Sequence, residues 1–291
     1  MTLKPDVEAF FDEATSTLSY IVIDTVSSKC AIIDAVLDYD PASGKVSYQS
    51  ADKLIDYVQK RKLEVVWILD THPHADHLSA MDYLLDTYGS AGAKTAIGQG
   101  ITKVQALWSD KFNFEDEFKA DGSQFNCLLD PKETFKLGNL ECEVIATPGH
   151  TPSCCTFRIG DALFVGDTLF MPDGGSARAD FPGGDARTLY RSIQTILSFP
   201  EEMRIFVCHD YQPGGRAMEY ETTVGAQKAD NIHVGGGKSE EEFVELRTQR
   251  DKTLGAPRLL YPSLQVNIRA GRLNPVESNG QIYMKTPVTK S

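Results

Sequence analysis

Five of the six histidines in this 291-residue chain lie just beyond short apolar runs, and this placement constrains the fold more than any other feature. Three of them fall within residues 71–77 (T-H-P-H-A-D-H), which follow the run 65–69 (V-V-W-I-L). His150, Asp167 and His209 each come shortly after a further apolar run. In layered α/β folds the loops at strand ends converge on one rim, where rigid strands aim polar groups at a common point. We therefore expect these side chains to meet.

Imidazole nitrogens and carboxylate oxygens are suitable ligands for a first-row divalent metal ion. Several histidines gathered without a metal would disfavour one another's protonated forms, because like charges repel. A metal site is therefore the favoured interpretation. His233 lies in a polar loop near the glycines at 235–237, and we interpret it as structural. The candidate site residues are His72, His74, Asp76, His77, His150, Asp167 and His209.

Apolar periodicity predicts alternating strands and helices along the chain. The expected strands are 18–24, 30–37, 65–69, 140–146, 156–159, 162–165 and 204–208. The expected helices are one capped by Ser50, then 78–88, 186–197, and one that opens with the capping box at 239–242. Residues 106–138 show no clear period and are expected to form an insertion-like loop. No strand is followed by a glycine-rich nucleotide-binding motif.

The charge balance argues against some partners. The 29 Lys and Arg residues against 41 Asp and Glu residues give a net charge of −12. We therefore expect no nucleic acid and no anionic membrane surface as partner. No apolar run approaches the roughly 18 residues of a membrane span, and the N-terminus lacks a secretory signal, so a cytoplasmic location is expected. Six cysteines are too few for a disulfide scaffold.

The motifs together resemble those of the metallo-β-lactamase superfamily. Residues 71–77 are similar to its T-H-x-H-x-D-H signature, and His150, Asp167 and His209 fill the later metal-binding positions in order. The resemblance covers residues 15–215, approximately. It implies an α/β fold, the αββα sandwich of two mixed sheets flanked by helices, with the metal site at one edge. We expect residues 1–235 to form the catalytic domain, and residues 236–291 to be a helix and tail packed on it.

Within the superfamily the chain looks most like the persulfide dioxygenases. The segments that carry this resemblance are 176–181 (S-A-R-A-D-F), 189–192 (L-Y-R-S), 209–211 (H-D-Y) and 262–271 (P-S-L-Q-V-N-I-R-A-G). The resemblance implies oxidation of glutathione persulfide by O2 to sulfite and glutathione. It also implies one Fe2+ per chain and a homodimer.

The resemblance also assigns roles to the site residues. His72, His150 and Asp167 are the implied iron ligands, and His74, Asp76, His77 and His209 are left as surrounding groups. Two histidines and one carboxylate on one face of an octahedral iron leave three positions open for substrate and O2.

The substrate needs a local basic pocket, because glutathione carries two carboxylates and this chain is acidic. Arg178 and Arg216 are the candidates, since an arginine fork suits a carboxylate. Tyr211 is expected to contact the peptide or the reacting sulfur, and we count it among the catalytic residues.

Two other functions stay open. A glyoxalase-II-like hydrolase of glutathione thioesters would use two zinc ions, and all seven of its potential ligands are present. The segment 178–181 and the C-terminal segment do not resemble glyoxalase II, and they favour the dioxygenase. A non-enzymatic metal-sensing or scaffolding protein is the third possibility, but such relatives usually lose ligands.

Overall fold

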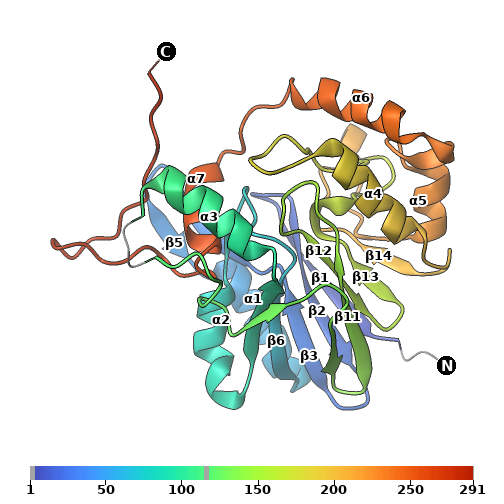
Figure 1. Ribbon diagram of the computed structural model, residues 1–291. Coiled ribbons are helices and arrows are strands. Elements are labelled where there is room, and N and C mark those ends of the chain that lie inside the picture. The colour runs from blue at the N-terminus through green and yellow to red at the C-terminus, as the bar shows by residue number, and fades with distance from the viewer. Residues whose placement is uncertain (1–3, 115–117, 291) are drawn as a thin grey trace.

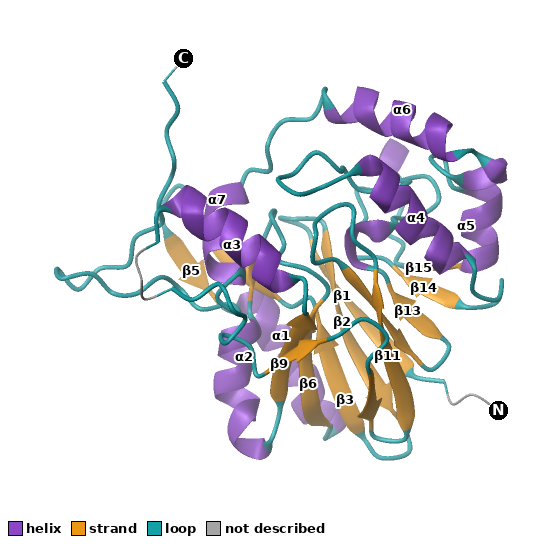
Figure 2. Cartoon of the chain, in the orientation of Figure 1, coloured by secondary structure: helices purple, strands orange, loops and turns teal. Residues whose placement is uncertain are grey.

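Alternate side chains of strand β2 (Thr17–Asp24) enter two different apolar clusters. Leu18, Tyr20 and Val22 face a cluster that lies between two sheets, whereas Ile21 and Ile23 face a cluster under helices. Successive residues of a strand point to opposite faces, so an unbroken apolar run belongs to a strand covered on both sides. The computed structural model describes residues 4–114 and 118–290, and it confirms the αββα sandwich (Figures 1 and 2).

The first sheet has six strands in the order β1-β2-β3-β6-β8-β9. Its strands β1, β2 and β3 pair antiparallel, and β3, β6, β8 and β9 pair parallel, so the sheet is mixed. The bounds are β1 (Asp6–Asp12), β3 (Lys29–Ile33), β6 (Glu64–Asp70), β8 (Lys94–Gly98) and β9 (Cys127–Leu129).

The second sheet has the order β10-β11-β12-β13-β14-β15 and is antiparallel except where β13 pairs parallel with β14. Its strands are β10 (Thr134–Leu137), β11 (Leu140–Ala146), β12 (Cys155–Ile159), β13 (Ala162–Phe164), β14 (Arg204–Phe206) and β15 (Glu221–Thr223). A small third sheet consists of β4 (Val36–Asp40), β5 (Lys45–Ser47) and β7 (Leu78–Ser79).

Helices cover the outer face of each large sheet (Figure 1). Those on the first sheet are α1 (Gln49–Arg61), α2 (Met81–Tyr88), α3 (Ile101–Phe112) and α7 (Leu260–Asn267). Those on the second sheet are α4 (Ala186–Leu197), α5 (Val224–Asp230) and α6 (Glu240–Asp251). Within the described ranges, none of the helices has both the length and the apolar character needed to cross a bilayer.

Several expected elements differ from the observed ones. The run 30–37 is not one strand, because Asp34 adopts a positive φ of 53° and separates β3 from β4. Ser50 does not cap α1 but lies inside it, where its hydroxyl donates to Asp38 (2.8 Å). The predicted helix 78–88 begins only at Met81, since Leu78 and Ser79 pair with β4 as β7.

The region 106–138 is not an insertion-like loop throughout. It contains the end of α3 and strands β9 and β10, although its residues 115–117 lie outside the described part of the chain. Trp108, Phe112, Phe118 and Phe125 are buried in the cluster under the helices of the first sheet. Helix α3 packs on the distant helix α7, where the ring of Phe112 lies against that of Tyr261 (centroids 6.2 Å apart), and local periodicity cannot reveal such a contact.

Candidate metal centre

Four loops bring the candidate metal ligands to one edge of the sandwich. The loop after β6 holds His72, His74, Asp76 and His77. The other three loops follow β11, β13 and β14, and they supply His150, Asp167 and His209 in turn. All the histidines and Asp167 are buried, whereas Asp76 is half-buried. The expected convergence of these side chains therefore occurs in the structure.

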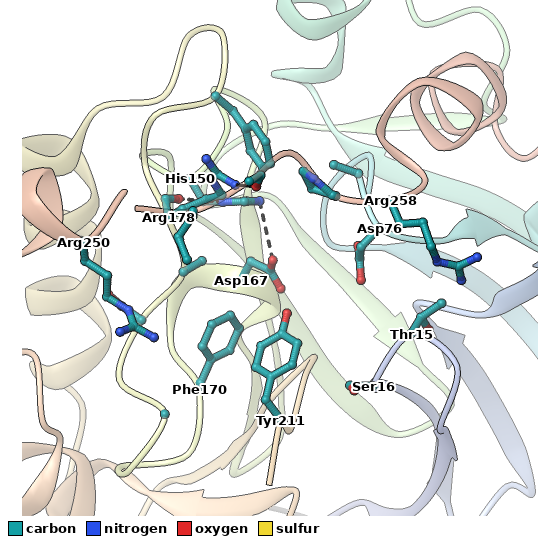
Figure 3. A pocket seen from close by; sticks show the side chains of 18 of the residues that line it. Thr15, Ser16, Asp76, His150, Asp167, Phe170, Arg178, Tyr211, Arg250 and Arg258 are labelled. Atoms are coloured by element: carbon teal, nitrogen blue, oxygen red, sulfur yellow. Dashed lines mark hydrogen bonds and ion pairs between the residues drawn. The ribbon is translucent and has the colours of Figure 1, made fainter. Parts of the chain in front are cut away.

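His72, His150 and Asp167 form one compact group, with one ligand atom of each residue within 4.8 Å of the others. Oδ2 of Asp167 lies 3.9 Å from Nε2 of His72 and 3.5 Å from Nε2 of His150. Figure 3 shows Asp167 and His150 facing each other at the wall of an open cavity. These three residues offer two nitrogens and one carboxylate to a single ion.

A second group lies beside the first. His74, Asp76 and His77 also place one ligand atom each within 4.8 Å of one another. Nε2 of His209 lies 3.4 Å from Oδ2 of Asp76 and 3.2 Å from Oδ1 of Asp167. Asp167 therefore presents one carboxylate oxygen to each side of the site.

The ligand atoms themselves make no hydrogen bonds within the described part of the chain. Leaving a buried polar atom without a partner costs about 1–3 kcal/mol, so native proteins contain few of them. Here six such atoms lie in the two neighbouring groups, and divalent cations bound there would satisfy them. The residues therefore fit a metal ion. The six atoms are Nε2 of His72, Nδ1 of His74, Oδ2 of Asp76, Nε2 of His77, Oδ1 of Asp167 and Nε2 of His209.

The second nitrogen of all five site rings is held by a partner outside the site: Nδ1 of His209 contacts the carbonyl of Ser16 (3.2 Å), and the other four rings are held in the same way. Such bonds fix the ring orientation and aim the free nitrogen toward the metal. The pairs are Nδ1 of His72 with Oγ1 of Thr71 (3.0 Å), Nε2 of His74 with Oδ1 of Asp34 (3.1 Å), Nδ1 of His77 with the carbonyl of Leu78 (3.0 Å), and Nδ1 of His150 with the carbonyl of Arg178 (2.7 Å).

Burial and neighbouring charges shift the histidine pKa values in two directions. Burial lowers the pKa of His72 well below its usual value and that of His77 to about 4, and the charge of His74 adds to both effects. Burial also opposes protonation of His74, but the carboxylate of Asp34 raises its pKa to about 9. Against the same burial, the carboxylates of Asp76 and Asp167 raise the pKa of His209 to about 10.

Sequence reasoning missed Asp34, which supports the metal-binding loop from β3. Its buried carboxylate accepts hydrogen bonds from the amide (2.7 Å) and the hydroxyl (3.0 Å) of Thr71, in addition to the contact with His74. One signal was available, since Asp34 is the single charged residue in the apolar run 30–37.

Asn267, at the end of α7, was also missed. Its side-chain amide donates to the carbonyls of His74 and His77, both at 2.8 Å. Its side-chain oxygen accepts from the amide of Ser79 at 2.7 Å. The segment 262–271 carries part of the family resemblance, but nothing local marks the role of Asn267, because its partners lie about 190 positions earlier.

A cavity of about 490 Å³ opens beside the first group of ligands. Tyr211 lines it as expected, with its ring stacked on His209 (centroids 5.7 Å apart) and its hydroxyl directed toward Asp167 (Figure 3). Arg178 lines it too, but its guanidinium already contacts both carboxylate oxygens of Asp180 (2.6 and 2.8 Å) and the carbonyl of Gly255.

Arg216 is not among the described residues that line this cavity. Its guanidinium is held between the carboxylates of Asp173 (2.6 and 2.8 Å) and Asp210 (2.7 and 2.8 Å). This geometry gives Arg216 a structural role, because all three guanidinium nitrogens already donate to these two carboxylates. The expected contact between Arg216 and substrate does not follow from the structure.

The fold and the buried His/Asp cluster define a metal-binding enzyme of a known class. The sequence profile of the metallo-beta-lactamase superfamily matches residues 13–209, and the chain belongs to this superfamily. Its relatives include both hydrolases and persulfide dioxygenases.

Two relatives are about 50% identical to this chain over the aligned residues. The "Beta-lactamase hydrolase-like protein" of Agrobacterium fabrum is 52% identical over 98% of this chain, which spans 65% of that protein's length. "Glyoxylase B2" of Dictyostelium discoideum is 48% identical over 99% of this chain and 98% of its own.

Persulfide dioxygenases are more distant relatives. The mitochondrial persulfide dioxygenase ETHE1 of Homo sapiens is 26% identical over 91% of this chain and 88% of its own. The crystal structure of ETHE1 from Myxococcus xanthus superposes with a TM-score of 0.72 at 26% identity, covering 92% of this chain and all of the other.

Proposed function

We propose that this chain is a persulfide dioxygenase that oxidises glutathione persulfide with O2 at one Fe2+ per chain. The observation that carries the proposal is the buried group of His72, His150 and Asp167 beside the cavity. Two histidines and one carboxylate with open positions are typical of non-haem Fe(II) oxygenases. The similarity to persulfide dioxygenases over 91% of the chain supports the same reaction.

The proposed reaction balances with one water molecule. Glutathione persulfide, O2 and water give glutathione, sulfite and two protons, and the S–S bond of the persulfide is the bond that breaks. The outer sulfur is oxidised and O2 is reduced. When bound, Fe2+ supplies the redox chemistry that lets O2 react with a spin-paired sulfur compound.

The chain's own residues hold and orient the reactants in this proposal. His72, His150 and Asp167 would hold the iron and leave its cavity side open. The hydroxyl of Tyr211, directed toward Asp167, is placed to donate a hydrogen bond to a substrate sulfur or peptide group (Figure 3). The ring of Phe170 packs edge-on against that of Tyr211 (centroids 5.6 Å apart) and helps to orient it.

The alternative function is a glyoxalase-II-like hydrolase of glutathione thioesters. A specific observation favours it, since the ligand atoms of His74, Asp76 and His77 are as free of hydrogen bonds as that of His72. In this function the seven candidate ligands would hold two zinc ions, whose chemistry is to make water nucleophilic enough to hydrolyse a thioester. The 48% identity to a protein named glyoxylase B2 supports this alternative.

Parallel assays of anaerobically purified protein separate these functions. We expect O2 uptake and sulfite formation on addition of glutathione persulfide, and no cleavage of S-lactoylglutathione. Thioester cleavage without O2 uptake would reject the dioxygenase in favour of the hydrolase. The absence of both activities would favour a non-enzymatic scaffold. The homodimer and the cytoplasmic location remain predictions, to be checked by light scattering and by cell fractionation.

A further inference from the structure

The cavity wall is completed by residues that lie beyond the superfamily match, which ends at residue 209. Helix α6 and the segment after it contribute Arg247, Arg250 and Arg258 to the lining. Together with Arg178, four arginines therefore border one cavity in a chain with a net charge of −12. Such a concentration of positive charge indicates an anionic ligand.

Two of these arginines are neutralised within the protein. The buried guanidinium of Arg247 pairs with Asp251 at 2.7 Å and donates to the carbonyl of Ser176 at 2.9 Å. Asp251 in turn accepts from the amide of Ala179 at 2.9 Å. Arg178 is compensated by Asp180. These two arginines hold the cavity wall in place, and their charge is not available to a ligand.

Arg250 and Arg258 differ from the other two. Both side chains are exposed, and neither makes an ion pair or a hydrogen bond with residues 4–114 or 118–290. Figure 3 shows them on opposite sides of Asp167, with Arg250 on the side of Phe170 and Arg258 beyond Asp76. The cavity is thus bordered by two guanidinium groups that have no ion pair, one on each side of the ligand group, although the charge of Arg258 also acts on the exposed carboxylate of Asp40.

We propose that Arg250 and Arg258 bind the two carboxylates of the glutathione moiety, and that this contact selects a glutathione-sized ligand with two carboxylates over smaller thiols. The cavity volume of about 490 Å³ is in the range for a ligand of this size. An arginine fork matches a carboxylate in geometry and charge. The inference rests on the proposed function only for the glutathione moiety, which the dioxygenase and the alternative hydrolase both require.

The test uses Arg250→Gln, Arg258→Gln and the double variant as metal-loaded proteins. Glutathione, which both candidate reactions release, is the binding probe in calorimetry. We expect each single change to weaken its binding roughly five- to tenfold and the double change by more. The KM for glutathione persulfide should rise by the same factors with kcat unchanged, because this contact acts on bound substrate and transition state alike. The KM for cysteine persulfide, which has one carboxylate, should change less.

Arg272→Gln is the matched control, since Arg272 is an exposed arginine that pairs with Asp82 and lies outside the described lining of the cavity. It should bind glutathione as the unaltered protein does. Wild-type affinity and selectivity in the double variant would overturn the inference. An unaltered protein that binds glutathione through these arginines but oxidises no persulfide would support the inference and reject the dioxygenase.

Discussion

Asp167 is the residue on which the site depends most, because its two carboxylate oxygens face the two groups of histidines. Burial opposes its negative charge, yet the neighbouring His209 holds the pKa of Asp167 well below its usual value. The carboxylate is therefore charged at neutral pH and needs positive charge beside it. In the proposed site, a divalent ion held by Asp167, His72 and His150 would supply that charge.

Removing one proposed ligand should abolish iron binding. We expect His72→Ala and Asp167→Ala to contain less than a tenth of the iron of the unaltered protein, because a facial site with two ligands left is weak. His77→Ala is the matched control and should retain one iron per chain. Metal quantification by mass spectrometry measures this. Full iron content with normal turnover in either ligand variant would contradict the assignment.

His233 predicts a pH dependence of stability. Its Nδ1 accepts from the amide of Ser176 at 2.9 Å, and burial, aided by the charge of Arg247, lowers its pKa to about 4. The folded-state pKa lies below the unfolded value of about 6.5, so the neutral ring contributes stability above that value. That stability should be lost as pH falls from about 6.5 to about 4.

Urea unfolding at pH 7.5 and pH 4.5 tests this point. Between these two pH values, the free energy of unfolding should fall by about 2 kcal/mol less in His233→Gln than in the unaltered protein. An equal loss in both proteins would mean that His233 does not titrate as described.

At the scale of elements, helix α7 acts on the metal-binding loop through Asn267. We expect Asn267→Ala to lower the free energy of unfolding by about 2–3 kcal/mol, because the buried carbonyls of His74 and His77 lose their donor. Amide exchange of residues 71–79 should become faster. Asn279→Ala, an exposed change in the tail, serves as the control. Unchanged amide exchange of this loop in Asn267→Ala would contradict the idea that the Asn267 side chain holds the loop in place.

Elements with strong local signals could be predicted from the sequence. Helix α4 has the expected bounds, because Leu189, Ile193 and Ile196 recur at helical spacing and Asp185 caps its first turn. Ser239 and Glu242 form the expected capping box of α6. Helices α3 and α7 escaped prediction because much of their burial comes from each other and from residues far away in the chain.

The same distinction applies to the site. The candidate ligands could be found because each follows an apolar run that ends at the sheet edge. Asp34 had one local signal, its charge within an apolar run, whereas the roles of Asn267, Arg250 and Arg258 could not be recognised, because they depend on partners brought near only by the complete fold. Arg216 was predicted to bind substrate because its motif lies next to the metal loop. In the structure, two carboxylates of the protein hold its side chain instead.

At the scale of the molecule, Asp24 connects the two sheets. Its carboxylate, at the end of β2, accepts from the hydroxyl of Ser27 (2.6 Å) and from both the amide and the side chain of Asn139 (2.8 Å each), which follows β10. Burial opposes its charge, but the hydrogen bonds of Ser27 and Asn139 lower the pKa of Asp24 to about 2. The carboxylate thus joins a turn of each sheet.

We expect Asp24→Ala to lower the free energy of unfolding by about 1–3 kcal/mol at pH 7. A depressed folded-state pKa means that this stability is present above about pH 4 and is lost as pH falls toward 2. Guanidinium unfolding should therefore show a smaller difference in the free energy of unfolding between the variant and the unaltered protein at pH 2.5 than at pH 7. A constant difference would contradict the role given to the carboxylate.

The division of the chain at residue 235 remains a proposal. We propose that residues 236–291 are part of the catalytic unit, because α6 packs on α4 and α7 packs on β7. Both also supply side chains that support or line the site. Expression of residues 1–235 alone should give an unstable protein without bound metal, and a folded, metal-loaded fragment would refute this.

Anomalous diffraction at the iron and zinc absorption edges, from anaerobically grown crystals, tests the central claim most directly. We predict a single iron peak per chain, within bonding distance of His72, His150 and Asp167. Two zinc peaks bridged by Asp167, with His74 and His209 also bonded, would contradict the account and establish the dinuclear alternative.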